Sequence, residues 1–221
     1  MRRLVPFALV ALVVALVPGS VHASTRPRWD TRVFASVPSP GFPAYVYRHP
    51  NGRVYAGTYT NLLGDTIRSR VFEWTARGTL LRSWTVPGQD LTAEHGVQVA
   101  TSDARGRLVL LEKSTSAVLT LNVRTGRFRR QARLPDLPIC STGVRPCSPN
   151  AVDQPAIPNY ATWGPHGDLF VSDYGQAVIW RIPATGGRPR IWFASKALDG
   201  VEFGTTGLVY QPARRTVLIG Q

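Results

Sequence analysis

The sequence predicts an all-β protein, a β-propeller built of four-stranded blades, and two observations lead to this fold class. A strand-turn-strand unit of similar size recurs along the chain, which is the sequence signature of propellers and solenoids. Glycine and proline, 20 and 18 of 221 residues, interrupt the chain throughout, and no segment after the N-terminal leader keeps a 3.6-residue apolar period. A β-sandwich is the competing architecture, but it does not account for the recurring unit.

The first 23 residues have the features of a secretory signal peptide. Arg2 and Arg3 precede an uncharged apolar run at 4–17, and Val21-His22-Ala23 supplies the small residues that signal peptidase requires. The apolar run is shorter than the roughly 20 residues of a membrane-spanning helix, so cleavage is favoured over a retained anchor. The sequence therefore predicts a secreted, extracellular protein without a stable membrane span.

The rest of the chain is divided into an N-terminal extension, residues 24–41, and a propeller domain, residues 42–221. In the first repeat the turn Asn51-Gly52 is a strong hairpin signal, and most of the later turns also contain glycine. About three and a half blades are expected, so the chain is predicted to be part of a longer ring. The strands are predicted at 45–47, 53–57, 71–74 and 80–86 in the first repeat, 96–100, 108–111, 117–123 and 128–134 in the second, 160–163, 169–172, 177–182 and 189–193 in the third, and 207–210 and 216–219 in the fourth.

Within a repeat, the apolar character changes from strand to strand. The second strands are continuous apolar runs, such as Leu108–Leu111 and Val217–Ile219, which indicates strands covered on both faces by neighbouring sheets. The outermost strand of the second repeat, Phe128–Arg133, is heavily charged, as an edge that meets water should be. This gradient is what radially stacked blades require.

The two cysteines, Cys140 and Cys147, lie close together in a proline-rich stretch. Because an exported protein meets an oxidising environment, the pair is predicted to form a disulfide that pins a loop, with metal binding as the alternative. A loop this short contributes roughly 2 kcal/mol by chain entropy. The bridge is therefore expected to fix local shape rather than hold the fold together.

The charge of the chain does not by itself indicate a nucleic-acid partner. The formal net charge is +13, but 24 of the 26 basic residues are arginine, which suggests a compositional bias, and the cluster at 124–133 falls on an edge strand. Several enzyme classes lose support because their motifs are absent from the predicted mature sequence: the Gly-x-Ser-x-Gly elbow, the Walker loop, the dinucleotide fingerprint, His-Glu-x-x-His and Cys-x-x-Cys.

Two segments carry a resemblance to a known family. Pro158–Asp173 and Thr206–Pro212 look like the blade signature of the gluconolactonase, senescence-marker-protein and luciferin-regenerating-enzyme superfamily, and the resemblance spans about residues 42–221. Members of this superfamily are six-bladed propellers, and most are metal-dependent lactonases. Strictosidine synthase-like propellers share the same strand and turn pattern.

The resemblance implies a divalent cation, calcium or zinc, at the mouth of the central channel, where it polarises a lactone carbonyl and activates water. Its ligands project where the innermost strands begin, and these positions hold Ala44, His95, Asn159 and Thr206 in this sequence. Only Asn159 matches the family pattern. Asn159 and Glu94 are therefore the predicted metal ligands, and His95 is the predicted catalytic residue, which completes the shell or relays a proton.

Other residues have two interpretations that the sequence leaves open. Asp173, at the end of a second strand, is a predicted ligand-binding residue, and its alternative role is to accept hydrogen bonds from the backbone of the next turn. Asn159 has the corresponding alternative of capping a turn. The three tryptophans near the third repeat pack between blades or form a substrate platform, with packing favoured: Trp163, Trp180 and Trp192.

Taken with the resemblance, these residues predict a secreted propeller that binds a small-molecule ligand at its central channel, with metal-dependent hydrolysis of a lactone or ester as its chemistry. The alternative is a non-enzymatic extracellular binding propeller that uses loops such as Asp136–Pro158 to hold a protein or a glycan. Fold analogy supports both, because one propeller architecture hosts many functions.

Overall fold

The computed structural model describes residues 31–38, 42–59, 66–200 and 204–220. The predicted signal peptide, residues 1–23, lies outside the described residues. The blades belong to a compact unit that begins at Phe34. Part of the predicted N-terminal extension joins this unit, because Ala35 and Val37 pack against Phe72 and Trp74 of the first sheet.

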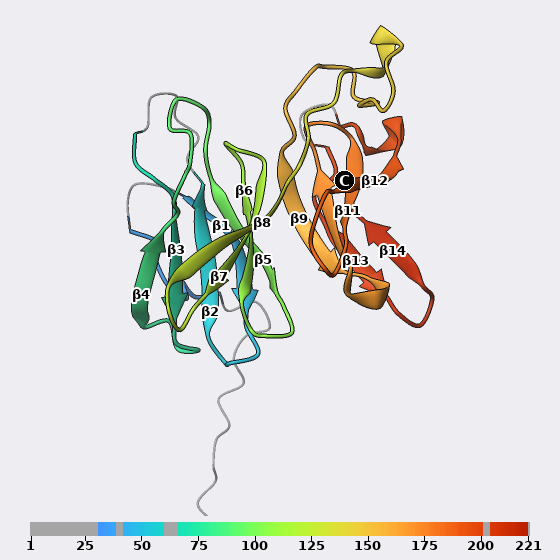
Figure 1. Ribbon diagram of the computed structural model, residues 1–221. Coiled ribbons are helices and arrows are strands. Elements are labelled where there is room, and N and C mark those ends of the chain that lie inside the picture. Colours follow the sequence, from blue (N-terminus) through green and yellow to red (C-terminus); the bar gives the residue numbers. More distant parts are fainter. Residues whose placement is uncertain (1–30, 39–41, 60–65, 201–203, 221) are drawn as a thin grey trace, which may run out of the picture. The chain divides into compact units, whose positions relative to one another are not determined.

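The described chain is all-β, which confirms the predicted fold class (Figure 1). Three short 3-10 turns interrupt it: η1 (Cys140–Thr142), η2 (Pro165–Gly167) and η3 (Lys196–Leu198). Three antiparallel four-stranded sheets follow the chain order and a two-stranded hairpin comes after them. The strands are β1 (Phe42–Arg48), β2 (Val54–Tyr59), β3 (Arg70–Trp74) and β4 (Leu80–Thr85); β5 (Val97–Ser102), β6 (Leu108–Glu112), β7 (Ala117–Asn122) and β8 (Arg127–Arg133); β9 (Pro158–Trp163), β10 (Leu169–Asp173), β11 (Val178–Ile182) and β12 (Arg190–Ala194); and β13 (Leu208–Gln211) with β14 (Thr216–Ile219).

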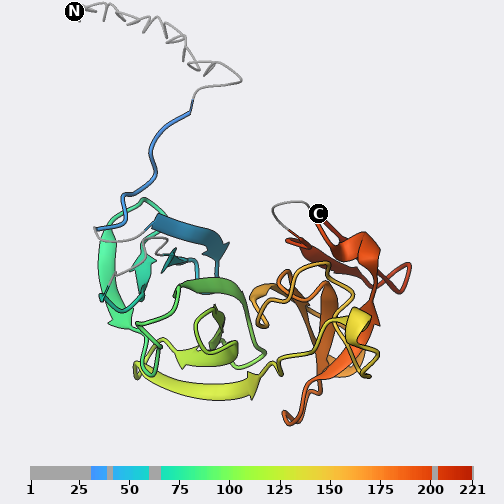
Figure 2. The ribbon, with the colours of Figure 1, turned by 90° about the horizontal axis from the view of Figure 1, so that it is seen from above.

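The first strand of each sheet lies on the inner side of the blades. Strand β5 contacts β1 and β2 of the first sheet and β9 of the third, and β9 in turn contacts β13. Figure 2 shows the successive sheets side by side within the compact unit, with the fourth strands β4, β8 and β12 away from these inner contacts. This is the radial stacking of a propeller.

Packing between sheets explains why the second strands read as unbroken apolar runs. Leu108 and Leu110 of β6 belong to the core between the first and second sheets. Val109 and Leu111, which alternate with them, belong to the core between the second and third sheets. Because successive side chains of a strand point to opposite faces, a strand between two sheets needs an apolar residue at every position.

The outer strands β4, β8 and β12 are mostly exposed, as predicted, but the predicted charged character of the outer strand holds only for β8. Strand β8 has charged, exposed positions as predicted, but β12 carries exposed Trp192, with 44% of its surface accessible, beside Phe193. The prediction that residues 217–219 are covered on both faces is also wrong. Val209 and Leu218, which face each other across β13 and β14, are 54% and 52% exposed, because no described residue packs on that side of the hairpin.

The predicted disulfide is confirmed. Cys140 and Cys147 are bonded, with their Cα atoms 4.9 Å apart, so neither thiol is available to a metal. The bridge is compatible with an oxidising compartment. Among the described residues, no helix has the length and apolar character needed to cross a membrane.

Candidate functional site

Polar and aromatic side chains gather at the end of the blades where the inner strands begin. Each second strand runs antiparallel to its inner strand, so second strands finish at this same end. Tyr59 is the last residue of β2, Lys113 follows β6 and Tyr174 follows β10. Together with Glu94, which precedes β5, these three side chains are called the inner-strand site here.

The Lys113 ammonium is at the centre of this site. Its Nζ lies 2.5 Å from Glu94 Oε1, 5.1 Å from the centre of the Tyr59 ring and 6.0 Å from that of Tyr174. Only 8% of the Lys113 side chain is exposed, against 47% for Glu94. A largely buried cation is thus held by a carboxylate and two aromatic faces, contacts that strengthen as water is removed.

Two tyrosines of this region, Tyr59 and Tyr45, are kept in their protonated form. Burial raises the pKa of Tyr59, and the neighbouring Tyr174 and Glu94 raise it further. Burial also raises the pKa of Tyr45, whose ring lies 5.2 Å from that of Tyr160, and Tyr160 adds to the shift. At neutral pH these phenols are hydrogen-bond donors.

The sequence-predicted residues Glu94 and Asn159 both lie where inner strands begin, but each has a protein partner. Glu94 pairs with Lys113. Asn159, which is buried on β9, accepts a hydrogen bond through Oδ1 from Gln98 Nε2 of β5 at 2.9 Å. The other side-chain atom of Gln98, Oε1, is buried and has no hydrogen-bond partner among the described residues. Such an orphaned acceptor is rare in folded proteins and is a candidate for ligand contact.

His95 is buried and faces the backbone. Its Nε2 lies 2.9 Å from the carbonyl oxygen of Ile67 and its Nδ1 lies 3.2 Å from that of Ala93. A neutral imidazole has one N–H, so it donates to one of these two carbonyls. These contacts give His95 a role in holding the chain before β5, and its catalytic role remains a prediction.

The arrangement does not fit a divalent cation held by Glu94, His95 and Asn159. In the described ranges of the chain, no group of three or more His, Cys, Asp or Glu side chains could hold a metal ion. Glu94 is already compensated by an ammonium, and both His95 nitrogens face carbonyl oxygens. The divalent cation implied by the resemblance remains a prediction.

Asp173 is fully buried and organises a turn. Its Oδ1 accepts hydrogen bonds from the backbone N–H groups of Ile157 at 2.8 Å and Gln176 at 3.2 Å, and its Oδ2 accepts one from Trp180 Nε1 at 2.9 Å. Burial raises the pKa of Asp173 to about 6, although these hydrogen bonds act in the opposite direction. The alternative role foreseen for Asp173 is thus present, and ligand binding by it stays a prediction.

A hollow of about 260 Å³ lies beside Tyr174. Asn150, Gln154 and Asp199 line it together with the Tyr174 ring, so its walls are mostly polar. It extends the inner-strand site toward the loop that precedes β9.

Sequence reasoning did not identify Tyr59, Lys113 or Tyr174. A signal for them exists, because all three occupy the same place in the repeat, at or directly after the end of a second strand. Lys113 is also one of only two lysines in the chain.

The described sheets and their order define a β-propeller, and comparison with solved structures agrees with this class. A virginiamycin B lyase from Staphylococcus aureus matches with a TM-score of 0.52 and 16% identity, over 78% of this chain and 47% of its own. A streptogramin B lyase matches with a TM-score of 0.53 and 17% identity, over 84% and 56%. A luciferin-regenerating enzyme matches with a TM-score of 0.50 and 13% identity, over 75% and 48%.

The chain therefore spans about half the length of these propellers. At such low identity the likeness shows the fold alone. No protein-family model matches the chain. No curated protein sequence matches it significantly.

Proposed function

We propose that the chain is part of a secreted propeller enzyme of the gluconolactonase-like kind, which binds a small ligand at the inner-strand site and opens a lactone or related ester there. Two of its structural neighbours are named as lyases and one as a luciferin-regenerating enzyme, which supports a propeller enzyme. The Staphylococcus aureus lyase has been solved with quinupristin, so a propeller of this fold takes an organic ligand. The disulfide supports an oxidising location.

The observation that carries this proposal is the enclosed Lys113 ammonium. Ester cleavage develops negative charge on the carbonyl oxygen, and a preorganised positive group in a site shielded from water stabilises that charge more than a solvated one does. Lys113 is mostly buried and fixed by Glu94, Tyr59 and Tyr174, so it needs little reorganisation. The protonated Tyr59, which is hydrogen-bonded to Tyr174, is a second polar group of the site.

The remaining groups supply a base and a contact for orientation. Glu94 is the more exposed member of the ion pair with Lys113. We therefore assign it the role of the general base, which accepts a proton from water or substrate. The orphaned Gln98 Oε1 beside Asn159 is an acceptor for a ligand hydroxyl or amide N–H. This donor and acceptor set suits a small polar ester.

Replacing Lys113 with methionine is expected to lower kcat/KM for lactone opening by about 100-fold, because the charge that stabilises the developing oxyanion is lost while the side-chain volume is kept. The measurement is pH-stat turnover of a panel of aliphatic and sugar lactones. Lys196→Met is the matched control, since Lys196 is the other lysine of the chain and is exposed on η3. Near-ultraviolet circular dichroism confirms that both variants are folded.

The outcomes distinguish the candidates. Turnover that persists in EDTA and is lost in Lys113→Met supports the proposed site, and turnover that needs added Ca²⁺ or Zn²⁺ supports the cation implied by the resemblance instead. Equal turnover by Lys113→Met and Lys196→Met contradicts the role of Lys113. Binding without turnover supports the second candidate, a non-enzymatic binding propeller, which the mutual neutralisation of Glu94 and Lys113 favours.

A further inference from the structure

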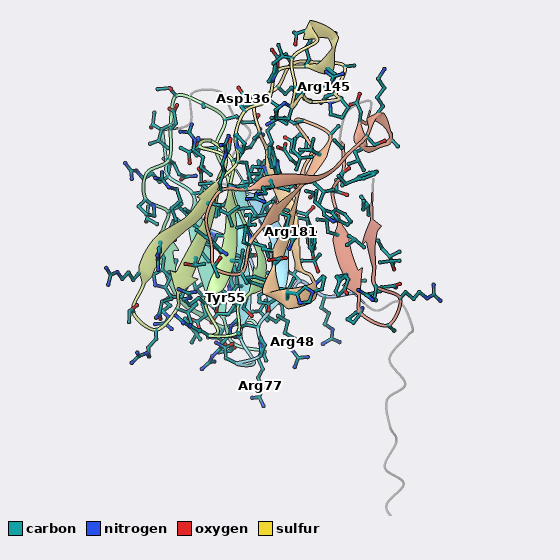
Figure 3. All side chains as sticks on the ribbon, turned by 45° about the vertical axis from the view of Figure 1, so that its right-hand side comes forward. Arg48, Tyr55, Arg77, Asp136, Arg145 and Arg181 are labelled. Atoms are coloured by element: carbon teal, nitrogen blue, oxygen red, sulfur yellow. A yellow bond between two sulfur atoms is a disulfide. The ribbon has the colours of Figure 1, made fainter. Side chains whose placement is uncertain are left out.

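A second hollow differs from the inner-strand site in the residues that line it. It has a volume of about 450 Å³ and is formed between the disulfide loop and strands β11 and β12. Figure 3 shows two of its lining residues, Asp136 and Arg145, near the same end of the bladed unit. This hollow is called the loop pocket below.

The floor of the loop pocket is apolar. Leu137, Trp180 and Ile191 line it, and all three belong to or pack against the core between the second and third sheets. Pro146 adds a further rigid apolar wall. The core therefore reaches the surface here, and the Trp180 ring is held in place by the hydrogen bond from its Nε1 to Asp173.

The rim of the loop pocket is positively charged. It carries Arg145, Arg188 and Arg190 against one acidic residue, Asp136. Within the described residues, none of these three arginines forms an ion pair. Arg181, which lies opposite Arg190 in the sheet, differs from them because its Nη2 pairs with Asp168 at 2.5 Å. The arginine charges around the pocket are thus left for another anion.

The wall of the pocket is preorganised by its own contacts. The disulfide closes the loop, and the Cys140 and Ser148 backbones bond across it at 2.8 Å. Gln176 Oε1 accepts a hydrogen bond from the Leu137 N–H at 2.8 Å, and Gln176 Nε2 donates one to the Pro135 carbonyl at 3.2 Å. A loop fixed in this way loses little conformational entropy when a ligand binds.

We propose that the loop pocket binds a small amphipathic anion, an aromatic or apolar body that carries one carboxylate. Its volume falls in the range of small-molecule sites, and such sites combine an apolar lining with a few charged groups that orient the ligand. The apolar body lies on Leu137, Trp180 and Ile191, and the carboxylate pairs with Arg188 or Arg190, since arginine forms bidentate bonds with carboxylates. This site is separate from the lactone chemistry and does not depend on it.

The test is calorimetric titration with 1-naphthaleneacetate, its neutral amide and acetate. Naphthaleneacetate is expected to bind, with the amide about tenfold weaker and acetate not measurable, because both the charge and the apolar body are needed. The double variant Arg188→Ala/Arg190→Ala is expected to bind naphthaleneacetate about tenfold more weakly than wild type. Arg48→Ala/Arg77→Ala removes the same charge at the opposite end of the bladed unit, where Figure 3 labels both residues, and should bind like wild type.

A second variant tests the wall. Cys140→Ser/Cys147→Ser, shown to be folded by circular dichroism, is expected to bind naphthaleneacetate about threefold more weakly, because the loop is no longer preorganised. Equal affinity for the acid and the amide overturns the proposal. Binding that survives in Arg188→Ala/Arg190→Ala and is lost in Lys113→Met also overturns it, because the carboxylate then occupies the inner-strand site.

Discussion

Replacing Gly57 with alanine is expected to lower the free energy of unfolding by about 3 kcal/mol or more, and Tm by about 10 °C. A Cβ at Gly57 on β2 would overlap the carbonyl oxygen of Val97 on β5 and lie 2.8 and 2.9 Å from its carbonyl carbon and Cγ1. Two of these three atoms are backbone, so the clash is relieved only if β2 and β5 separate. Differential scanning calorimetry measures the loss.

Gly207→Ala is the matched control for this substitution. Gly207 has no heavy atom within 4 Å of a built Cβ and does not have positive φ. Alanine at such a position changes stability by less than about 1 kcal/mol. Equal Tm values for the two variants would mean that the first and second blades are not packed through this contact.

Replacing Asp173 with asparagine is expected to lower the free energy of unfolding by about 3 kcal/mol. This is the second large effect on stability that we expect. The two carboxylate oxygens accept three N–H groups, from Ile157, Gln176 and Trp180. Asparagine has one acceptor oxygen, so its NH₂ group must face at least one N–H donor in a buried site. Asp90→Asn, on an exposed turn where Oδ1 accepts from the Thr92 N–H, should leave Tm close to wild type.

The pH dependence of this effect has a definite sign. The pKa of Asp173 is raised to about 6 in the folded chain, against the ordinary value of 3.8 for an aspartate. Between these values the native state binds more protons than the unfolded state, so the contribution of Asp173 to stability grows as pH falls through 6 and is lost as pH rises again. From pH 7 to 5, wild type should gain on the order of 1 kcal/mol relative to Asp173→Asn. A constant difference between the two proteins across this range would contradict the raised pKa.

The blades were predictable because their signals are local. The turns at Gly52 and Gly126 have φ of 79° and 71°, a conformation that glycine adopts without strain, and each joins two strands that pair antiparallel, β1 with β2 and β7 with β8. The second strands contain apolar runs because neighbouring sheets pack on both of their faces. Such features recur in every repeat, so each one supports the others.

The apolar residues of the outer strands and the exposure of the last hairpin were not predictable in the same way. Whether Leu218 or Trp192 is covered depends on what lies against its face, and a repeat pattern carries no information about that neighbour. Trp192 packs its ring against Phe170 at 4.8 Å between centroids and still leaves much of its surface accessible. A pattern of apolar residues alone therefore overestimates burial at the margins of the stack.

The candidate site was predictable in position and only in part in composition. Asn159 and Glu94 were predicted because the resemblance implies ligands where the inner strands begin, and their binding roles remain predictions. Lys113 and Tyr174 were missed because their contacts join the second and third blades, and residues far apart in sequence carry no local mark of that contact. Comparing equivalent positions between repeats finds both residues.

The turn at 173–176 connects the two candidate sites, and this has a consequence for sequence variation. Asp173 anchors the turn to Trp180, Tyr174 faces Lys113, the Gly175 carbonyl accepts a hydrogen bond from Asn150 at 2.7 Å, and Gln176 fixes the disulfide loop. Each of the four positions therefore makes a contact with a different neighbour. In a saturation library these positions should tolerate fewer substitutions than the exposed turn residues Arg124 and Thr125, so the turn is where divergent homologues would most plainly reveal whether they retain both sites.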